Sequence, residues 1–249
     1  MTIPQIVFII PYREREEQLH FFRRQITYVL EDKDPSTYKI IYVHQSDQRP
    51  FNRGALKNIG FLIVKDLYPN HYKTITLVFN DVDTIPNRKN DLEYETKKGK
   101  IKHFYGFHFA LGGIVSVTGE DFEKMNGFPN YWAWGYEDNA LQKRAEQNNI
   151  AVDRSKFYKL MDPHIIHLNE SIRRVVNREE YNRHYFNSKE GIKNITQLKY
   201  TMDDETQFAN VTQFETGIVP DMTKYKIHDI TKSDRPYGND RSKTMRMFI

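Results

Sequence analysis

Apolar runs alternate with helical patterns in the first third of the chain, and this alternation limits the possible folds more than any other feature. Residues 6–10 (IVFII), 38–43 (YKIIYV) and 74–79 (TITLVF) are short apolar runs, typical of strands buried on both faces. Residues 14–31 and 55–67 lie between them and carry apolar side chains at helical spacing. The order βαβαβ predicts parallel strands joined by right-handed crossovers.

The fold class that follows is α/β, with a Rossmann-like, mostly parallel twisted sheet flanked by helices. Ligands of such sheets bind beyond the carboxyl ends of the strands. We expect two more helices, at residues 119–127 and 137–148. The pattern is weak past residue 185, and we expect only short strands there, around residues 225–230.

Size and composition exclude several classes of protein. A chain of 249 residues, 39% of them hydrophobic, can bury one substantial α/β core or two small ones, and a single domain with a C-terminal elaboration is the simpler expectation. No stretch approaches the roughly 20 apolar residues of a membrane span and no basic leader precedes the first strand, so we expect a soluble, cytoplasmic chain. The 37 basic and 33 acidic residues are too balanced to indicate nucleic-acid binding.

Metal ligands must come from Asp, Glu, His or Met, because the sequence contains no cysteine. Asp81 and Asp83, in NDVDTIP, are two positions apart at the end of the third predicted strand, so both point the same way on an extended chain. Such a pair brings a divalent cation to a diphosphate, with one carboxylate on the metal and the other accepting from ligand hydroxyls. Asp-x-Asp is also common in turns, but the buried strand before it favours the metal site.

Two histidines, His164 and His167 in DPHIIHLNE, are the best candidates for further metal ligands. Imidazoles three positions apart can converge on one ion from a loop, although such a pair alone is more often a surface accident. Together with an aspartate they would favour a first-row divalent ion such as manganese over magnesium, which prefers oxygen ligands and water.

Arginines follow the first two predicted strands. Arg13 and Arg15 lie in PYRER, after the first strand, and Arg53 lies in FNRG, after the second. Guanidinium groups match phosphate oxygens well, and three of them at neighbouring strand ends favour a diphosphate site over the usual solvated arginines. Tyr12 or Phe51 could offer a flat face to a base.

Both tryptophans of the chain lie beside two acids, in NGFPNYWAWGYEDNALQKRA. Core tryptophans usually sit inside regular elements, so Trp132 and Trp134 on a predicted loop indicate a platform for an apolar sugar face, or a lid. Asp138, near the start of the predicted helix, could take a proton from an attacking hydroxyl. The alternative is that Glu137 and Asp138 only cap the helix.

Taken together, these segments resemble a known family. FNRGALKNIGF, NDVDTIP and above all NGFPNYWAWGYEDNALQKRA are similar to the signature blocks of the β1,4-galactosyltransferases, in order from about residue 6 to about residue 167. The resemblance implies a GT-A fold and an inverting glycosyltransferase. Such an enzyme moves a hexose from a UDP-sugar to the hydroxyl of an acceptor glycan, with Mn2+.

The resemblance implies a role for each matching residue. The residues that match the nucleotide-binding segments are Pro11, Tyr12, Arg13, Arg15, Phe51, Asn52 and Arg53. In the DVD triplet, Asp81 matches the acid near the donor sugar and ribose, Val82 lies between, and Asp83 matches the metal ligand, as does His167.

The same resemblance assigns the acids of the tryptophan segment to the reaction centre. Asp138 matches the catalytic base, and Glu137 beside it positions donor and acceptor. Trp134 matches the tryptophan of a mobile loop that closes over the donor, and Gly135 and Tyr136 complete the acceptor side. We therefore expect the aromatic pair to form a sugar-closing loop.

Three departures from the family pattern bear on specificity. His164 stands where many animal members have Met, which gives the ligand set Asp83, His164 and His167. Ala110 falls where galactose-specific members carry a large tyrosine, so UDP-GalNAc is a donor candidate alongside UDP-Gal. Tyr136 replaces a glycine of the family's GGED. The family's disulfides and membrane anchor are missing too, which would fit a bacterial or viral enzyme or a trimmed catalytic domain.

The sequence thus predicts a manganese-dependent, inverting transferase of Gal or GalNAc that forms a β linkage, β1,4 by family, with Asp138 as general base. Residues 1–185 would form the catalytic core, and residues 186–249 an extension that packs on the core and ends in a mobile basic tail. One alternative is a sugar-binding module that has lost catalysis. Another is a metal-dependent nucleotidyltransferase, which would release pyrophosphate and would leave the tryptophan segment without a role.

Overall fold

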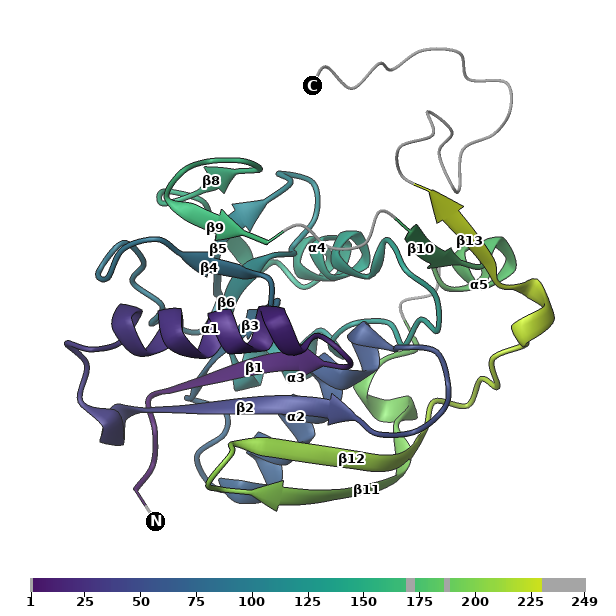
Figure 1. Cartoon of the computed structure of the whole chain (residues 1–249), viewed down its shortest axis with the longest axis horizontal. Coiled ribbons are helices and arrows are strands. Elements are labelled where there is room, and N and C mark those ends of the chain that lie inside the picture. The colour runs from purple at the N-terminus through teal and green to yellow at the C-terminus, as the bar shows by residue number, and fades with distance from the viewer. Residues whose placement is uncertain (1, 169–172, 186–188, 230–249) are drawn as a thin grey trace.

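The computed structural model describes residues 2–168, 173–185 and 189–229 (Figure 1). The predicted βαβαβ unit forms as expected, in three strands and two helices: β1 (Ile6–Tyr12), α1 (Glu16–Val29), β2 (Tyr38–Gln45), α2 (Arg53–Leu67) and β3 (Thr76–Asn80). The strands β2 and β3 both pair with β1 in parallel. The predictions from residues 6–80 are therefore confirmed.

The central sheet continues on both sides of this unit. In the described residues it has nine strands in the order β11-β12-β2-β1-β3-β6-β5-β7, with β8 also paired to β5. The added strands are β5 (Lys100–Gly106), β6 (Ile114–Thr118), β7 (Ala151–Asp153), β8 (Tyr158–Lys159), β11 (Thr196–Asp203) and β12 (Phe208–Glu215). Five of its pairings are parallel and three, β3 with β6, β6 with β5 and β11 with β12, are antiparallel. The sheet is thus mixed and mostly parallel.

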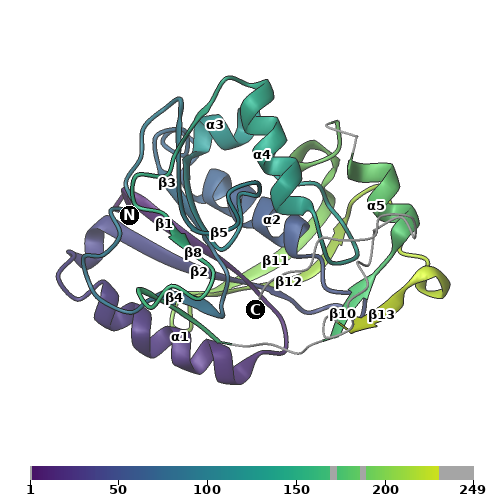
Figure 2. The same ribbon diagram turned by 90° about the horizontal axis from the view of Figure 1, so that it is seen from above.

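Helices cover both faces of the sheet. Figure 2 shows α1 on one face and α2, α3 (Gly119–Lys124) and α4 (Glu137–Gln147) on the other. The two predicted helices after residue 118 are confirmed, with slightly earlier ends. Because both faces are covered, the side chains of β1 alternate between two cores, with Val7 and Ile9 in one and Phe8 in the other.

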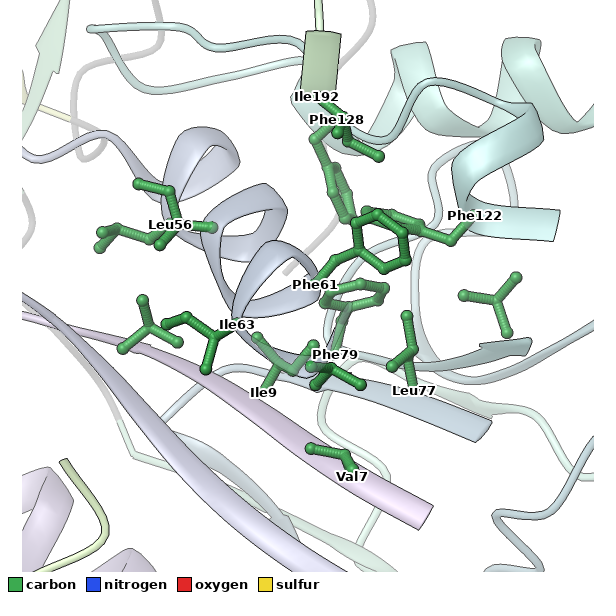
Figure 3. Close-up of a cluster of buried hydrophobic side chains, with 14 of the residues drawn as sticks. Val7, Ile9, Leu56, Phe61, Ile63, Leu77, Phe79, Phe122, Phe128 and Ile192 are labelled. Atoms are coloured by element: carbon green, nitrogen blue, oxygen red, sulfur yellow. The ribbon is translucent and has the colours of Figure 1, made fainter. Parts of the chain in front are cut away.

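The core beneath α2 shows how tightly that helix packs on the sheet (Figure 3). Phe61 of α2, Phe79 of β3 and Phe122 of α3 meet there with ring centroids 4.5 to 5.4 Å apart. A Cβ added to Gly60 would lie 2.3 Å from Ile9, so only glycine lets α2 approach β1 this closely. This contact sets how close α2, which begins with Arg53, lies to β1.

The strands after residue 185 are longer than predicted. β11 and β12 have eight residues each, and β12 pairs in parallel with β2 inside the main sheet. The expectation of only short strands there was wrong, because β11 is a half-exposed edge strand whose polar side chains hide its period. The short strand predicted near residues 225–230 is present as β13 (Lys226–Asp229). Residues 230–249, the predicted basic tail, lie outside the described residues.

Several short elements complete the described fold. β4 (Thr84–Pro86) pairs with β9 (Ile165–His167), and β10 (Arg173–Val176) pairs with β13. The helix α5 (Arg178–Tyr185) and the one-turn helices η1 (Pro35–Thr37), η2 (Ile192–Asn194) and η3 (Met222–Lys224) lie in connections. None of the helices in the described part of the chain combines the length and the apolar character that a membrane span requires.

Candidate active site

The start of α2 is fixed by Asn52. Its side chain accepts from the backbone N–H of Ala55 at 2.9 Å, and its amide nitrogen donates to the carbonyl of Asn130 at 3.2 Å. The backbone N–H of Asn52 donates to the side chain of Gln45 at 2.9 Å. Because Asn52 is fully buried and makes these bonds, it positions Arg53, and its direct contact with a nucleotide stays a prediction.

Arg53 lies at the centre of three carboxylates. Its Nε and Nη2 donate to the two carboxylate oxygens of Asp81 at 2.9 and 2.6 Å. Its Nη1 donates to Glu137 at 2.6 Å and to both oxygens of Asp138 at 3.1 Å. Four predicted site residues from α2, α4 and the end of β3 therefore meet in one charge-assisted network. Arg53 is thus engaged with three acids, whereas Arg15 contacts Asp83 and Arg13 the carbonyl of Arg49, so the shared diphosphate site of the three arginines stays a prediction.

A second cation, Lys57, completes this cluster of charges. Lys57 lies one turn after Arg53 on α2 and is 1% exposed, and its Nζ is 3.6 Å from Asp81 and 3.5 Å from Asp138. The sequence-based predictions did not include Lys57 in the site. The pattern that could have indicated it is a lysine in the stretch ALKNIGF, four residues after Arg53, where the helix otherwise carries core side chains.

Burial and charge act in opposite directions on these acids. Burial alone would raise the pKa of Asp81, but the charges of Arg53 and Lys57 lower it well below its usual range. For Glu137, burial raises the pKa, and Arg53 offsets only part of that effect. The cluster thus holds Asp81 ionised and keeps Glu137 closer to its neutral form.

The side chain of Asp138 packs against the loop 106–113 at Gly112, where only a glycine leaves room for it. The backbone N–H of Leu111 donates to the carbonyl of Asp138 at 3.0 Å, and a Cβ on Gly112 would lie 2.4 Å from its Oδ2. The loop 106–113 therefore closes against the first turn of α4, with Ala110 two residues from the carboxylate contact. Tyr136, before α4, has a left-handed φ of 68°, and the N–H of Gly135 donates to Glu137 at 3.2 Å.

Asp83 and His167 are brought side by side by the pairing of β4 with β9, in which Thr84 lies opposite His167. Asp83 accepts from Thr84 Oγ1 at 2.9 Å and from Arg15 at 3.3 Å. Burial and the negative charge of Asp81 raise the pKa of Asp83, and Arg15 offsets only part of that effect. His167 Nδ1 lies 3.1 Å from the hydroxyl of Tyr105, so Nε2 is the nitrogen that could ligate. The carboxylate of Asp83 and the imidazole of His167 together offer oxygen and nitrogen donors that fit a first-row divalent cation.

His164 does not join them in this structure. Its ring stacks on Tyr158, with centroids 4.7 Å apart, and its Nδ1 lies 2.8 Å from Asp162. Across the described residues no group of three His, Cys, Asp or Glu side chains stands ready to hold a metal ion. Of the three predicted ligands, the structure thus brings Asp83 and His167 together and leaves His164 apart from them.

The other predicted nucleotide residues lie around the carboxyl end of β1. Pro11 and Tyr12 are buried in β1, where the ring of Tyr12 packs between His44 and Phe208 at 5.4 Å from each. Arg13 donates to the carbonyl of Arg49. Phe51 is half-buried against the core beneath α2, and the side chain of Val82 points into the opposite core. Of this group Arg13 and Phe51 keep part of their surface exposed.

Trp132 is a core residue, not half of a sugar-closing pair. It is fully buried, stacks on Phe214 at 5.4 Å, and donates from its indole N–H to the carbonyl of Ile218 at 2.9 Å. Arg49 covers both rings at 4.5 Å. Trp134 is 45% exposed, so only this tryptophan remains a candidate for contact with sugar.

A buried histidine, His103 of β5, lies on the far side of Asp138. It is 1% exposed, and burial, with help from the charge of Arg154, lowers its pKa to about 4. Its Nε2 donates to the carbonyl of Tyr105 at 3.0 Å, and its Nδ1 accepts from Arg154 at 3.1 Å, an arrangement that requires the neutral ring. His103 is therefore neutral at neutral pH.

His103 should make the fold sensitive to acid. Its folded pKa of about 4 lies below the unfolded value of about 6.5, so the unfolded chain binds the proton first as the pH falls. Stability is lost between these two values, by about 2 kcal/mol from pH 7.5 to pH 5. Urea unfolding of wild type and His103→Gln at both pH values measures this, and equal losses in the two proteins would rule it out.

The fold and the cluster together define a class. A mostly parallel sheet with an Asp-x-Asp turn at its carboxyl edge is the architecture of the GT-A glycosyltransferases, and solved structures agree. The catalytic domain of Drosophila β1,4-galactosyltransferase 7 in complex with xylobiose superimposes with a TM-score of 0.67, covering 89% of this chain and 97% of that one at 23% identity. A mutant of that enzyme, in complex with manganese, UDP-Gal and xylobiose, gives a TM-score of 0.66.

The chain belongs to the β1,4-galactosyltransferase family. Two adjoining family models, described as the N-terminal region of glycosyl transferase group 7 and the N-terminal domain of galactosyltransferase, match residues 2–95 and 95–169. The predicted family is thereby confirmed.

Curated relatives agree with this assignment. β-1,4-galactosyltransferase 5 of Sus scrofa is 34% identical over 162 residues, which are 60% of this chain and 40% of the relative. β-1,4-galactosyltransferase 4 of Mus musculus is 31% identical over 62% of this chain and 46% of its own length. The chain thus spans less than half the length of these two relatives. They are animal proteins, so they lend no support to a bacterial or viral source.

Proposed function

We propose that this protein is an inverting, manganese-dependent glycosyltransferase that moves Gal or GalNAc from a UDP-sugar to a hydroxyl of an acceptor glycan. The observation that carries this proposal is the meeting of Asp81, Glu137 and Asp138 on Arg53, beside Asp83 and His167, at the carboxyl edge of the sheet. Glycosyl transfer needs these parts: a base, a cation site for the diphosphate, and acids that bind sugar hydroxyls. Family membership and the neighbour with UDP-Gal and manganese support the same reading.

The proposed reaction is a single displacement. The acceptor hydroxyl oxygen attacks the anomeric carbon of the donor, the bond from that carbon to UDP breaks, and UDP leaves with the bonding electrons. Asp138 takes the hydroxyl proton, and its carbonyl bond to Leu111 keeps its backbone fixed against the loop. Attack from the face opposite the leaving group inverts the anomeric carbon.

The donor side of the site is divided among three groups of residues. Asp83 and His167 would hold manganese, which neutralises charge on the leaving diphosphate when it is bound. Arg13 and Arg15 would contact phosphate oxygens, and Arg15 already reaches Asp83 at 3.3 Å. We propose that His164 turns from Tyr158 to become the third ligand when donor binds.

The acceptor side is supported by an exposed aromatic pair. Phe107 and Phe109 are 48% and 64% exposed, and their rings stack at 5.2 Å with 19° between planes. The side chain of Asn139, next to Asp138, donates to the carbonyl of Phe109 at 3.1 Å, which ties this pair to the reaction centre. Exposed aromatic faces bury the apolar faces of sugars. With Trp134 they support a glycan acceptor.

The donor sugar is set by the residue at position 110. Ala110 is buried in the loop that contacts Asp138, so a large side chain there would occupy space near the donor. We expect Ala110→Tyr to lower kcat/KM for UDP-GalNAc relative to UDP-Gal by about 10- to 100-fold, because the ring excludes the N-acetyl group. Competition between the two donors measures the ratio. Ala110→Gly is the matched control and should keep GalNAc use, and an unchanged ratio in Ala110→Tyr would contradict the proposal.

UDP release tests the function as a whole. The assay offers UDP-Gal, UDP-GalNAc, UDP-Glc and UDP-GlcNAc with manganese, magnesium or chelator, and with simple sugars or water as acceptors. Turnover of Gal or GalNAc donors that chelator abolishes supports the proposal. Binding of UDP without turnover of any donor would favour a sugar-binding module, and pyrophosphate released from a nucleoside triphosphate would favour a nucleotidyltransferase.

A further inference from the structure

Lys57 is a buried charge that the proposed reaction has not yet used. Its side chain is 1% exposed, and its Nζ lies between Asp81 and Asp138, at 3.6 and 3.5 Å from their Oδ1 atoms. The ammonium group also lies 4.7 Å from the centroid of the Phe128 ring. Lysines are almost never this buried unless they are paired with acids.

Packing alone would favour an apolar residue at this position. Neighbouring positions of α2 carry Leu56, Ile59 and Phe61 in the core, and a methionine has nearly the length of a lysine. Burying an ammonium group is unfavourable unless close acids compensate it, and removing one partner of a buried ion pair leaves the other charge uncompensated. Lys57 is therefore better explained by what its charge does to the two acids than by packing.

The two cations of α2 contact Asp138 differently. Arg53 Nη1 contacts both Oδ1 and Oδ2 at 3.1 Å, whereas the Lys57 ion pair is with Oδ1. Oδ2 lies over Gly112, where a Cβ would come within 2.4 Å. Oδ1 thus faces two cations, whereas Oδ2 faces Arg53 and the loop that carries Ala110 and the exposed aromatic pair.

The charges that face Asp138 come from three further elements. Glu137 precedes it on α4, and Asp81, after β3, shares both of its cations. His103 of β5 lies close by but is neutral at neutral pH. Three acids therefore share the two cations of α2, and without Lys57 Arg53 would be the one cation of α2 left among them.

We propose that Lys57 is a positioning residue for the transfer: its ammonium group fixes Oδ1 of Asp138 in the ionised form, so that Oδ2 receives the proton of the acceptor hydroxyl. The inference rests on the proposed function. Arg53 alone does not distinguish the two oxygens, because its Nη1 contacts Oδ1 and Oδ2 at the same distance of 3.1 Å. Among the described residues Lys57 pairs with Asp81 and Asp138 and not with Asp83, so its effect falls on the acid cluster and not on the cation site.

The test is the pH dependence of kcat/KM for Lys57→Met. We expect the acidic limb, which reports protonation of the base, to move up by about one pH unit. Below the limb kcat/KM should fall about tenfold, and well above it the rate should approach that of wild type. UDP affinity, measured by calorimetry, should change by less than about threefold. Lys65→Met, on the same helix and paired with surface Glu123, is the matched control and should leave the limb unchanged.

A chemical rescue separates charge from packing. The chain has no cysteine, so Lys57→Cys carries one thiol that can be aminoethylated in the unfolded protein before refolding, which restores an ammonium group of lysine length. Return of the acidic limb to its wild-type position supports the proposal, also if Lys57→Met fails to fold. A limb within about 0.2 pH units of wild type in Lys57→Met, or the same limb before and after aminoethylation, overturns it. If wild type turns over no donor at all, the proposed function fails first, which is a different result.

Discussion

Asp138→Asn is expected to lower kcat by about 10²- to 10⁴-fold, which is the usual worth of general base assistance. The amide has the shape of the carboxylate but cannot accept the proton of the attacking hydroxyl. It can still accept from Arg53, whose contacts to Asp81 and Glu137 do not involve Asp138. The fold and UDP binding should therefore survive, and the loss should appear in kcat.

Single-turnover kinetics with saturating donor measure the loss in rate, and calorimetry measures the affinity for UDP. Asp66→Asn is a suitable control, since Asp66 is an acid of α2 that only accepts from Tyr200 at the surface. If Asp138→Asn retains more than about a tenth of wild-type activity, Asp138 is not the base. Glu137, the other acid on α4 that contacts Arg53, would then be the next residue to test.

Asp83→Asn is expected to remove most manganese binding and to lower activity by about 10²- to 10³-fold, which corresponds to the several kcal/mol that a bound cation contributes. Asp83 is the acid whose pKa is raised by burial and by Asp81, so in the metal-free protein the neutral asparagine should be tolerated well. The variant should thus unfold no more easily than wild type, while its affinity for Mn2+ drops.

Electron paramagnetic resonance of free Mn2+ gives the affinity of each protein for Mn2+. Activity measured at increasing Mn2+ concentration shows how far the reaction depends on the metal. His164→Ala and His167→Ala are informative companions. Because we propose that His164 turns to ligate, His164→Ala and His167→Ala should both weaken Mn2+ binding. A loss in His167→Ala alone would mean that His164 stays stacked on Tyr158. Wild-type Mn2+ binding by Asp83→Asn would place the metal elsewhere.

Local pattern was enough for the first three strands of the sheet and for the members of the acid cluster. The runs IVFII, YKIIYV and TITLVF could only be buried strands, and the parallel order followed from the helices between them. Asp81 and Arg53 were then expected at one edge, because Asp81 directly follows β3 and Arg53 begins the helix after β2. The spacing of residues in the sequence could not predict that Asp81 and Arg53 contact each other. It also could not predict that Glu137 and Asp138 join them.

Long-range contacts decided what local pattern could not. Trp132 and Trp134 look alike in the sequence, two positions apart on one loop, but Trp132 is covered by Phe214 and Ile218, more than eighty residues later. The partner that buries it lies on β12, a strand whose weak pattern hid its place beside β2. The loop was predicted correctly, but which tryptophan stays exposed depended on a distant strand.

The sequence by itself determined the α/β class, the parallel order of the first three strands and the family, because hydrophobic period and signature spacing are local properties of the chain. Only the tertiary structure decided that Arg53 neutralises three acids, that Lys57 is buried between two of them, and that Asp83 has His167 but not His164 beside it. Burial and ion pairing depend on which distant segments meet. Those contacts exist only once the whole sheet has formed.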